Sequence, residues 1–239
     1  METIVVKRPD KVQYEVVRSR RRRRLALTVT DTCSVVVKAP YGITNTAIDS
    51  FVHTHEQWIR DRLSHIRSLP KPLEHTYTEG DSFLFLGKPL TLRLAHGTQG
   101  KTSCARVADS LVVNVHVRGG QSAVKGAIEQ WYRQEGLKVY RELVTRWTVT
   151  LETHHIPSIH IRSFPKRWGS CSKEGELSFA IRSLMLPYHL VEYLALHETA
   201  HMIHFNHGSD FRSTLTSHMP DWRTRQREMA TLRLKVSNL

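Results

Sequence analysis

Apolar and polar residues alternate in short runs through the first half of the chain, which predicts β-strands separated by turns. These runs lie at residues 12–16, 25–29, 35–37, 82–86, 90–94 and 111–117. Residues 44–69 differ, because apolar side chains there recur at helical spacing behind a capping Thr44 or Asn45. The pattern therefore predicts a β-rich N-terminal region that contains one long helix.

The second half of the chain is predicted to be mostly helical. Helical periodicity covers residues 122–147, about 187–205, 209–218 and a terminal segment that begins near 220. Between the first two helices, residues 159–164 and 176–181 read as short strands, and Lys173-Glu174-Gly175 supplies a turn that makes them a hairpin.

Gly119-Gly120 is the most linker-like point in the sequence. It divides a β-rich region, 1–118, from a helical region, 119–239. A single continuous domain, 1–239, is also compatible with the pattern, because two glycines do not prove a boundary. The expected fold class is α+β.

The helix predicted near 187–205 carries the pattern H-E-x-x-H. His197 and His201 are four residues apart, so both imidazoles lie on one helical face and can bind the same metal ion. Glu198 follows the first histidine, where a carboxylate can reach a water activated by the ion without binding the ion itself. Catalytic zinc uses three protein ligands and an open fourth position, so a further ligand is needed.

His207 is the best candidate for that ligand. On a continuous helix it would point about 240° away from His201, so the helix must end between them. Asn206 and Gly208 favour such an ending near Phe205, followed by a tight turn. Asp210 is a weaker alternative on the same turn.

The surroundings of this motif resemble the YgjP-like family of zinc metallopeptidases, which is related to the SprT-like and Spartan-type proteases. The residues that carry the resemblance are Arg167-Trp168-Gly169-Ser170-Cys171-Ser172, Gly175-Glu176-Leu177, Arg182, Pro187, His197-Glu198, His201 and Asn206-His207. His207-Gly208-Ser209-Asp210-Phe211 also matches the H-G-x-x-F of SprT-like members.

The resemblance implies a zincin-like catalytic core in which a backing helix and a small β-sheet support the active-site helix. It further implies one Zn²⁺ ion held by His197, His201 and His207, with Glu198 as the base. In zincins the edge of the small sheet borders the substrate cleft. Trp168, Gly169 and Ser170 are therefore expected to line the cleft.

The charge of the chain indicates a second class of partner. With 35 Lys and Arg against 22 Asp and Glu, the net charge is +13, which attracts polyanions such as nucleic acid. Arg18 and the run Arg20-Arg21-Arg22-Arg23-Arg24 are a candidate phosphate-binding patch, with a solvated strand end as the alternative.

Composition also bounds the location of the protein. No run of eighteen apolar residues exists, so no membrane partner is expected. The N-terminus lacks the apolar core of a secretory signal, and three scattered cysteines favour a reducing cytoplasm.

The expected function is hydrolysis of peptide bonds in a peptide or protein substrate, with Glu198 as general base at a zinc-activated water. An alternative is a nucleic-acid-associated zincin that acts on DNA-bound proteins, or a DNA-binding factor with little proteolysis. A purely structural metal is disfavoured, because closed structural sites use four ligands. The sequence does not identify the oxyanion donor; His204, His218, Tyr188 and Arg212 are alternatives.

Overall fold

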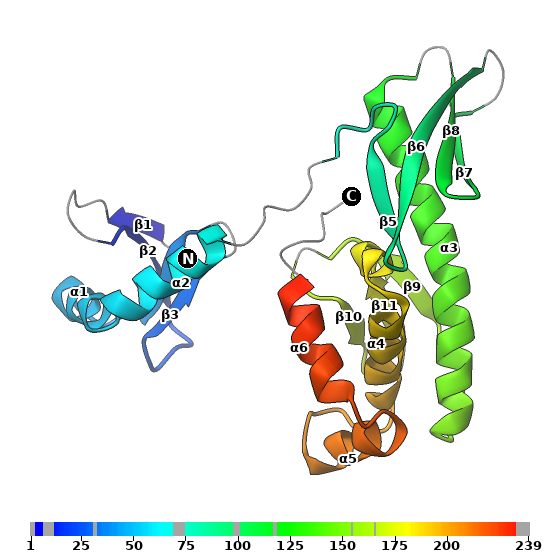
Figure 1. The fold of residues 1–239 in the computed structure, drawn as a ribbon. Helices are drawn as coiled ribbons and strands as arrows, with labels where there is room; N and C mark the ends of the chain where they lie inside the picture. The colour runs from blue at the N-terminus through cyan, green and yellow to red at the C-terminus, as the bar shows by residue number, and fades with distance from the viewer. Residues whose placement is uncertain are drawn as a thin grey trace. The chain divides into compact units, whose positions relative to one another are not determined.

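The computed structural model describes residues 3–6, 12–30, 33–68, 75–97, 101–116, 119–153, 155–164 and 166–232. The chain forms two compact units, residues 1–71 and 72–239 (Figure 1). The division expected at residue 119 falls inside the second unit. Gly120 lies there in extended conformation as the residue before a long helix, and that helix packs against the strands that precede it.

The first unit is a four-stranded sheet followed by two helices. The sheet order is β1-β2-β4-β3, with β2 and β4 parallel. The elements are β1 Thr3–Val6, β2 Tyr14–Ser19, β3 Ala26–Val29, β4 Val35–Pro40, α1 Asn45–Thr54 and α2 Glu56–Ser68. Side chains from the sheet and both helices form a core of their own, which includes Val37, Ile48 and Ile59.

One long helix was expected at 44–69, and the structure has two that meet at His55. Thr44 caps the first of them, since its hydroxyl accepts a hydrogen bond from the Ala47 N–H at 3.3 Å. At His55 the backbone N–H bonds to the Val52 carbonyl at 3.1 Å, while the ring Nδ1 lies 2.8 Å from the Phe51 carbonyl oxygen. The ring therefore takes the carbonyl that a continuing helix would use, and the helix breaks.

The second unit begins with another four-stranded sheet, in the order β5-β6-β8-β7. Its strands are β5 Ser82–Phe85, β6 Lys88–Gly97, β7 Ser103–Val107 and β8 Ser110–His116. The sheet packs on α3, Gln121–Thr150, with which it shares one hydrophobic core.

The β5–β6 turn anchors this sheet to the helical part of the unit. Leu86 and Gly87 both have positive φ, as a two-residue hairpin turn requires. The Leu86 N–H donates to the Leu184 carbonyl at 2.7 Å, and the Tyr132 hydroxyl donates to the Leu84 carbonyl at 2.5 Å. Hydrogen bonds and apolar packing thus join residues on both sides of position 119 into one body.

A three-stranded sheet follows α3, in the order β10-β11-β9. Its strands are β9 Ile159–Arg162, β10 Gly169–Cys171 and β11 Leu177–Ala180. The expected pairing was wrong in one respect: the strands near 159–164 and 176–181 are parallel neighbours, and the hairpin is formed by β10 and β11. The turn at residues 173–175 is confirmed, with Gly175 at φ +83°.

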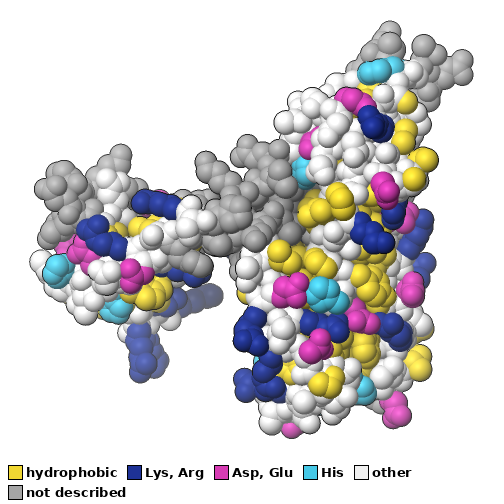
Figure 2. Space-filling model, viewed as in Figure 1, with side chains coloured by type: hydrophobic (Ala, Val, Ile, Leu, Met, Phe, Trp, Pro, Cys, Tyr) yellow, Lys and Arg dark blue, Asp and Glu magenta, His cyan; other side chains and the backbone are white. Residues whose placement is uncertain are grey.

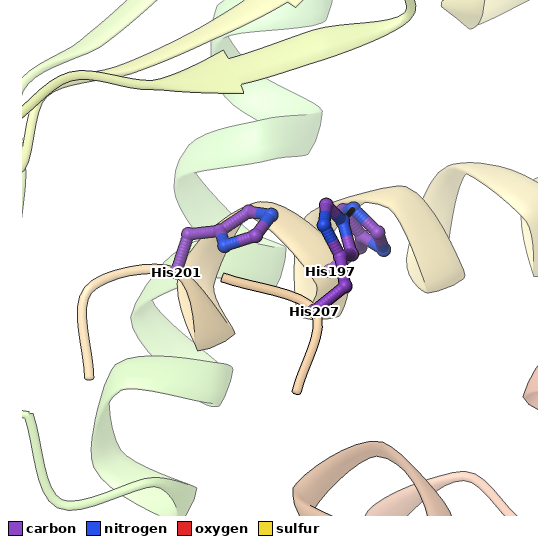
Figure 3. Close-up of side chains that lie close together, drawn as sticks. All are labelled: His197, His201 and His207. Atoms are coloured by element: carbon purple, nitrogen blue, oxygen red, sulfur yellow. Dashed lines mark hydrogen bonds between the residues drawn. The ribbon is translucent and has the colours of Figure 1, made fainter. Parts of the chain in front are cut away.

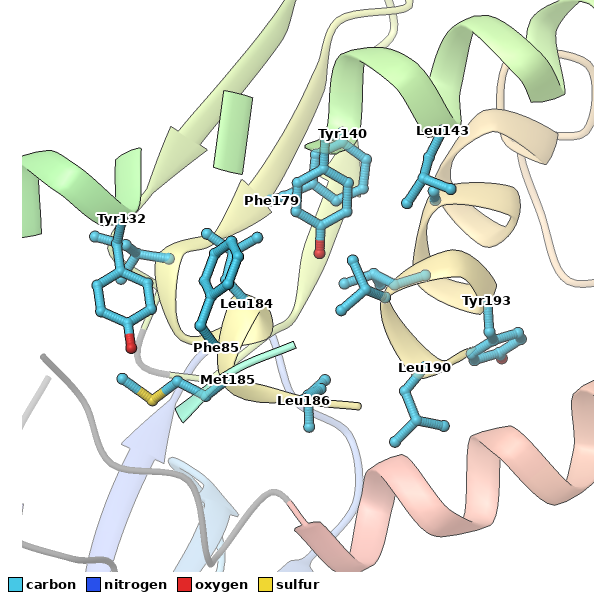
Figure 4. Close-up of a cluster of buried hydrophobic side chains, with 14 of the residues drawn as sticks. Phe85, Tyr132, Tyr140, Leu143, Phe179, Leu184, Met185, Leu186, Leu190 and Tyr193 are labelled. Atoms are coloured by element: carbon cyan, nitrogen blue, oxygen red, sulfur yellow. The ribbon is translucent and has the colours of Figure 1, made fainter. Parts of the chain in front are cut away.

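The 3₁₀ segment η1 Ile181–Met185 leads into α4 Tyr188–Ala200, α5 Ser209–His218 and α6 Trp222–Leu232. α4 is the central helix of the unit, since it contacts α3, α5, α6 and β10. Around it, Tyr140 stacks on Phe179 with ring centroids 3.7 Å apart, and the Tyr140 and Ser183 hydroxyl oxygens lie 2.6 Å apart (Figure 4). α4 is thus positioned by the core of the unit.

The α+β fold class predicted from the sequence is confirmed. Within the described ranges, no helix combines the length and the apolar character needed to cross a membrane.

Candidate metal centre

The C-terminal turn of α4 presents two histidines to one side. His197 and His201 are one turn apart, and their ring centroids are separated by 5.0 Å. Residues on the rest of this turn, including Leu196, Glu198, Thr199 and Ala200, are buried. The packing of the helix therefore determines where the two imidazoles lie.

α4 ends earlier than the sequence pattern suggested, at Ala200 rather than near Phe205. The N–H groups of Met202 and Ile203 bond to the carbonyls three residues back, at Thr199 and Ala200, so the helix tightens and stops.

His207 returns to the helix on the turn that follows, which Asn206 stabilises by accepting a hydrogen bond from the Gly208 N–H at 3.0 Å. The His207 Nε2 lies 3.1 Å from the His197 Nε2 (Figure 3). One ring nitrogen from each of His197, His201 and His207 falls within 4.8 Å of the others. Asp210 is not part of this cluster, and accepts a hydrogen bond from the Ser209 hydroxyl at 3.1 Å.

The separation of two of the ring nitrogens matches a tetrahedral metal ion. Zn–N bonds of about 2.05 Å place two tetrahedral ligand nitrogens about 3.3 Å apart, close to the separation of His197 and His207. The second nitrogen of two rings is engaged elsewhere. The Nδ1 of His201 lies 2.9 Å from the His204 carbonyl oxygen, and the Nδ1 of His197 lies 3.4 Å from the Tyr193 hydroxyl. Such contacts hold a ligating imidazole in one orientation and tautomer.

Burial favours the neutral form of the His197 and His201 rings, which is the form that binds metal. Burial, followed by the neighbouring His201 and His207, lowers the pKa of His197 to about 3. The pKa of His201 is also lowered, chiefly by burial.

Glu198 lies next to the histidines and is almost completely buried, with 5% of its surface exposed. Burial raises its pKa to about 8, and the positive charge of Arg167 acts in the opposite direction. Its side chain packs against the backbone of Gly169, where an added Cβ would lie 2.6 Å from the carboxylate Oε1. The carboxylate therefore occupies the space that any larger residue at position 169 would need.

A cavity of about 300 Å³ opens between the helix and strand β10. It is lined by Gly169, Ser170, Cys171, His197, Glu198, His201, Phe205 and His207. The cleft-lining positions expected at Gly169 and Ser170 thus lie beside the histidines, on the edge strand of the small sheet. Trp168 is not in this lining, and its ring packs against the Arg182 guanidinium at 4.5 Å.

Two further residues lie beside the site: Cys171, which belongs to the segment that carries the family resemblance, and Tyr193, which sequence reasoning missed. Cys171 faces the cavity, and burial, followed by the charge of Glu198, raises its pKa to about 11, so it is a thiol and not a thiolate. Tyr193 supports His197, and its position four residues earlier on the same helix could have identified it.

A second cavity, of about 800 Å³, adjoins the cluster on the α5 and α6 side. It is lined by His197, His207, Phe211, Arg212, Trp222, Arg223, Gln226 and Arg227. No pattern in the sequence showed that the arginines of α6 lie close to the histidines.

The family model described as the YgjP-like metallopeptidase domain matches residues 23–232. A crystal structure of the metallopeptidase zymogen jannalysin from Methanocaldococcus jannaschii is similar over 38% of this chain and 93% of that chain, with 18% sequence identity and a TM-score of 0.35. No curated protein matches the chain.

Proposed function

The chain belongs to the YgjP-like metallopeptidases, and we propose that it hydrolyses peptide bonds with one zinc ion held by His197, His201 and His207. The observation that carries the proposal is the meeting of three imidazoles from a helix and the turn after it, beside the buried side chain of Glu198. Three ligands leave a tetrahedral ion one open position, as catalytic sites require.

Zinc bound there supplies Lewis-acid chemistry, since it lowers the pKa of water and polarises a carbonyl group. Glu198 is the group of this chain that moves the proton. A divalent cation held by the histidines would favour its ionised form over the protonated form that burial alone favours. The carboxylate would then accept a proton from the attacking water and deliver it to the leaving amine. Its buried position beside Gly169 keeps the carboxylate from rotating away.

Strand β10 is the element that orients the substrate in this proposal. It lies at one edge of its sheet, so its outer backbone groups are available to an extended peptide. Gly169 and Ser170 also line the cavity that holds Glu198, so a peptide paired with β10 would lie across the histidines.

Elemental analysis and peptide turnover test the proposal together. The parent should bind one zinc ion per chain, and His197→Ala, His201→Ala and His207→Ala should each lose it. His96→Ala is the matched control, because His96 is exposed on β6, outside the cluster. Glu198→Gln should keep zinc and lose turnover by about 10³-fold or more, the range expected for loss of a general base with its electrostatic support. Unchanged turnover in Glu198→Gln would refute the assignment.

A second candidate is a zincin that acts on DNA-bound proteins, or a DNA-binding factor with little proteolysis. It is favoured by the exposed arginines of the first unit, where Arg20, Arg21, Arg23 and Arg24 are accessible to solvent. DNA affinity should then fall steeply with salt, because each phosphate contact contributes about 0.9 to the slope of log K against log salt.

A cytosolic location also remains a proposal, which rests on three unpaired cysteines.

A further inference from the structure

The larger cavity beside the histidines has an aromatic floor and a basic rim. Phe211 and Trp222 are buried, at 2% and 6% exposure, and form its apolar base. Arg212 of α5 and Arg223 and Arg227 of α6 are exposed around it. Figure 2 shows Lys and Arg side chains gathered along the edge of the second unit that α6 forms.

The carboxylates on α6 and just before it are paired with other residues. Asp221 pairs with Arg225, which also binds Glu192, and Glu228 pairs with His189. Within the described ranges, the three rim arginines have no ion pair with an acidic side chain. The positive charge of the rim is therefore available to a ligand.

The rim arginines are also partly held in place. The Arg223 guanidinium lies 4.6 Å from the Trp222 ring centroid, and the Arg227 Nε donates to the Arg223 carbonyl at 3.3 Å. A guanidinium restrained by such contacts loses less conformational freedom when it binds a carboxylate.

We propose that this cavity is a substrate subsite for a carboxylate one or two residues from the scissile bond. The inference rests on the proposed function, since His197 and His207 line both this cavity and the one that holds Glu198. A carboxylate in the subsite accepts hydrogen bonds from Arg223 and its neighbours, while the aliphatic part of the residue packs on Phe211 and Trp222.

The shape of the cavity favours a peptide over nucleic acid. A concave site of about 800 Å³ with an aromatic floor is of the size that holds a few side chains. Duplex DNA instead contacts proteins through phosphates spread along its backbone, which a single half-open cavity does not follow. The carboxylate has two sources in a peptide, namely an acidic side chain and the free C-terminus.

The test uses the full-length, zinc-loaded protein and decapeptides of alanine and leucine with both ends capped. One glutamate is moved through the sequence, and each peptide has a glutamine partner; a third set carries glutamine and a free C-terminal carboxylate. The preferred carboxylate peptide should be cleaved about tenfold faster in kcat/KM than its uncharged partner. An exposed ion pair alone would raise kcat/KM by up to about fivefold. Partial desolvation of the pair near the aromatic floor should strengthen it further.

Arg223→Glu should abolish the preference, and Arg227→Glu should reduce it. Arg141→Glu is the matched control: it makes the same change of charge at an exposed position of α3, outside the cavity lining. A direct binding measurement supplies a readout besides turnover. Fluorescence anisotropy of the labelled carboxylate peptide on Glu198→Gln protein should show about tenfold weaker binding when Arg223→Glu is added. Circular dichroism confirms that each variant is folded.

The outcomes separate the subsite from the proposed function. Equal cleavage and equal binding of charged and uncharged peptides would overturn the subsite and leave the metallopeptidase intact. If the parent cleaves no peptide, the proposed function fails, and the anisotropy comparison alone decides whether the cavity binds carboxylates. Preference for the free C-terminus supports the subsite and identifies its source. A short DNA duplex that binds through Arg223 while the carboxylate peptide does not would overturn the proposal in favour of nucleic acid.

Discussion

Replacing Gly169 by alanine tests whether the fit between strand β10 and Glu198 matters for the reaction. The added Cβ would lie 2.6 Å from the Glu198 Oε1 and 2.8 Å from both Cδ and Cγ. The distance from this Cβ to Oε1 is about 0.8 Å shorter than the shortest ordinary van der Waals contact, 3.4 Å. Because Glu198 is buried, either its carboxylate or the edge strand must move.

The substitution should reduce stability slightly and turnover strongly. Overpacking of this kind costs about 1–3 kcal/mol of stability, which lowers Tm by several degrees in a unit of this length. A displacement approaching 1 Å at a catalytic group reduces turnover by about a hundredfold. The variant should therefore remain folded and keep its zinc, but lose most of its activity.

The assay compares Gly169→Ala with Gly126→Ala in peptide turnover, zinc content and thermal unfolding. At Gly126, on the exposed face of α3, an added Cβ meets nothing within 4 Å, and alanine should stabilise the helix by about 0.5–1 kcal/mol. Parental turnover in Gly169→Ala would show that Glu198 is not held by β10, or that its position does not limit the reaction.

Two further predictions concern the metal-free protein. Chelation should lower Tm by about 5–10 °C, since zinc at a hundredfold excess over its Kd contributes about 2.7 kcal/mol, and each kcal/mol corresponds to about 2–4 °C. His207→Ala should show no such difference, and an equal shift in that variant would exclude His207 from the ligand set. Without metal, the pKa of His197 is about 3 in the folded chain against 6.5 for an ordinary histidine, so the unfolded chain takes up a proton first as pH falls. The stability of the metal-free parent should then decline as the pH falls below about 6.5. Scanning calorimetry should show a smaller decline in His197→Asn. Identical dependence of Tm on pH in the two proteins would contradict the reasoning.

The metal-ligand candidates could be predicted from the sequence because their geometry is local. His197 and His201 share a helical face by periodicity alone, and Asn206 and Gly208 indicated a turn that brings His207 back. Which residues surround the cluster depends on contacts between distant segments. Gly169 meets Glu198 only because β10 packs on α4, and Arg223 reaches the same region only because α6 packs on α4.

The boundaries of the elements show the same division between local and tertiary effects. α5 was predicted from Ser209 to about His218, and the observed helix has these bounds. The break at His55 depends on a ring-to-carbonyl contact that periodicity does not register. The parallel pairing of β9 with β11 likewise cannot be read from two short alternating runs, because alternation does not encode which neighbour a strand chooses.

The turn between α4 and α5 also has a consequence for how the chain can vary in length. Exposed connections between helices usually accept insertions and deletions. Here the spacing from His201 to His207 brings an exposed imidazole back onto a buried helix, so one residue more or fewer would shift that ring by up to about 3.5 Å. The length of the turn between His201 and His207 is therefore constrained as tightly as the identity of the two histidines.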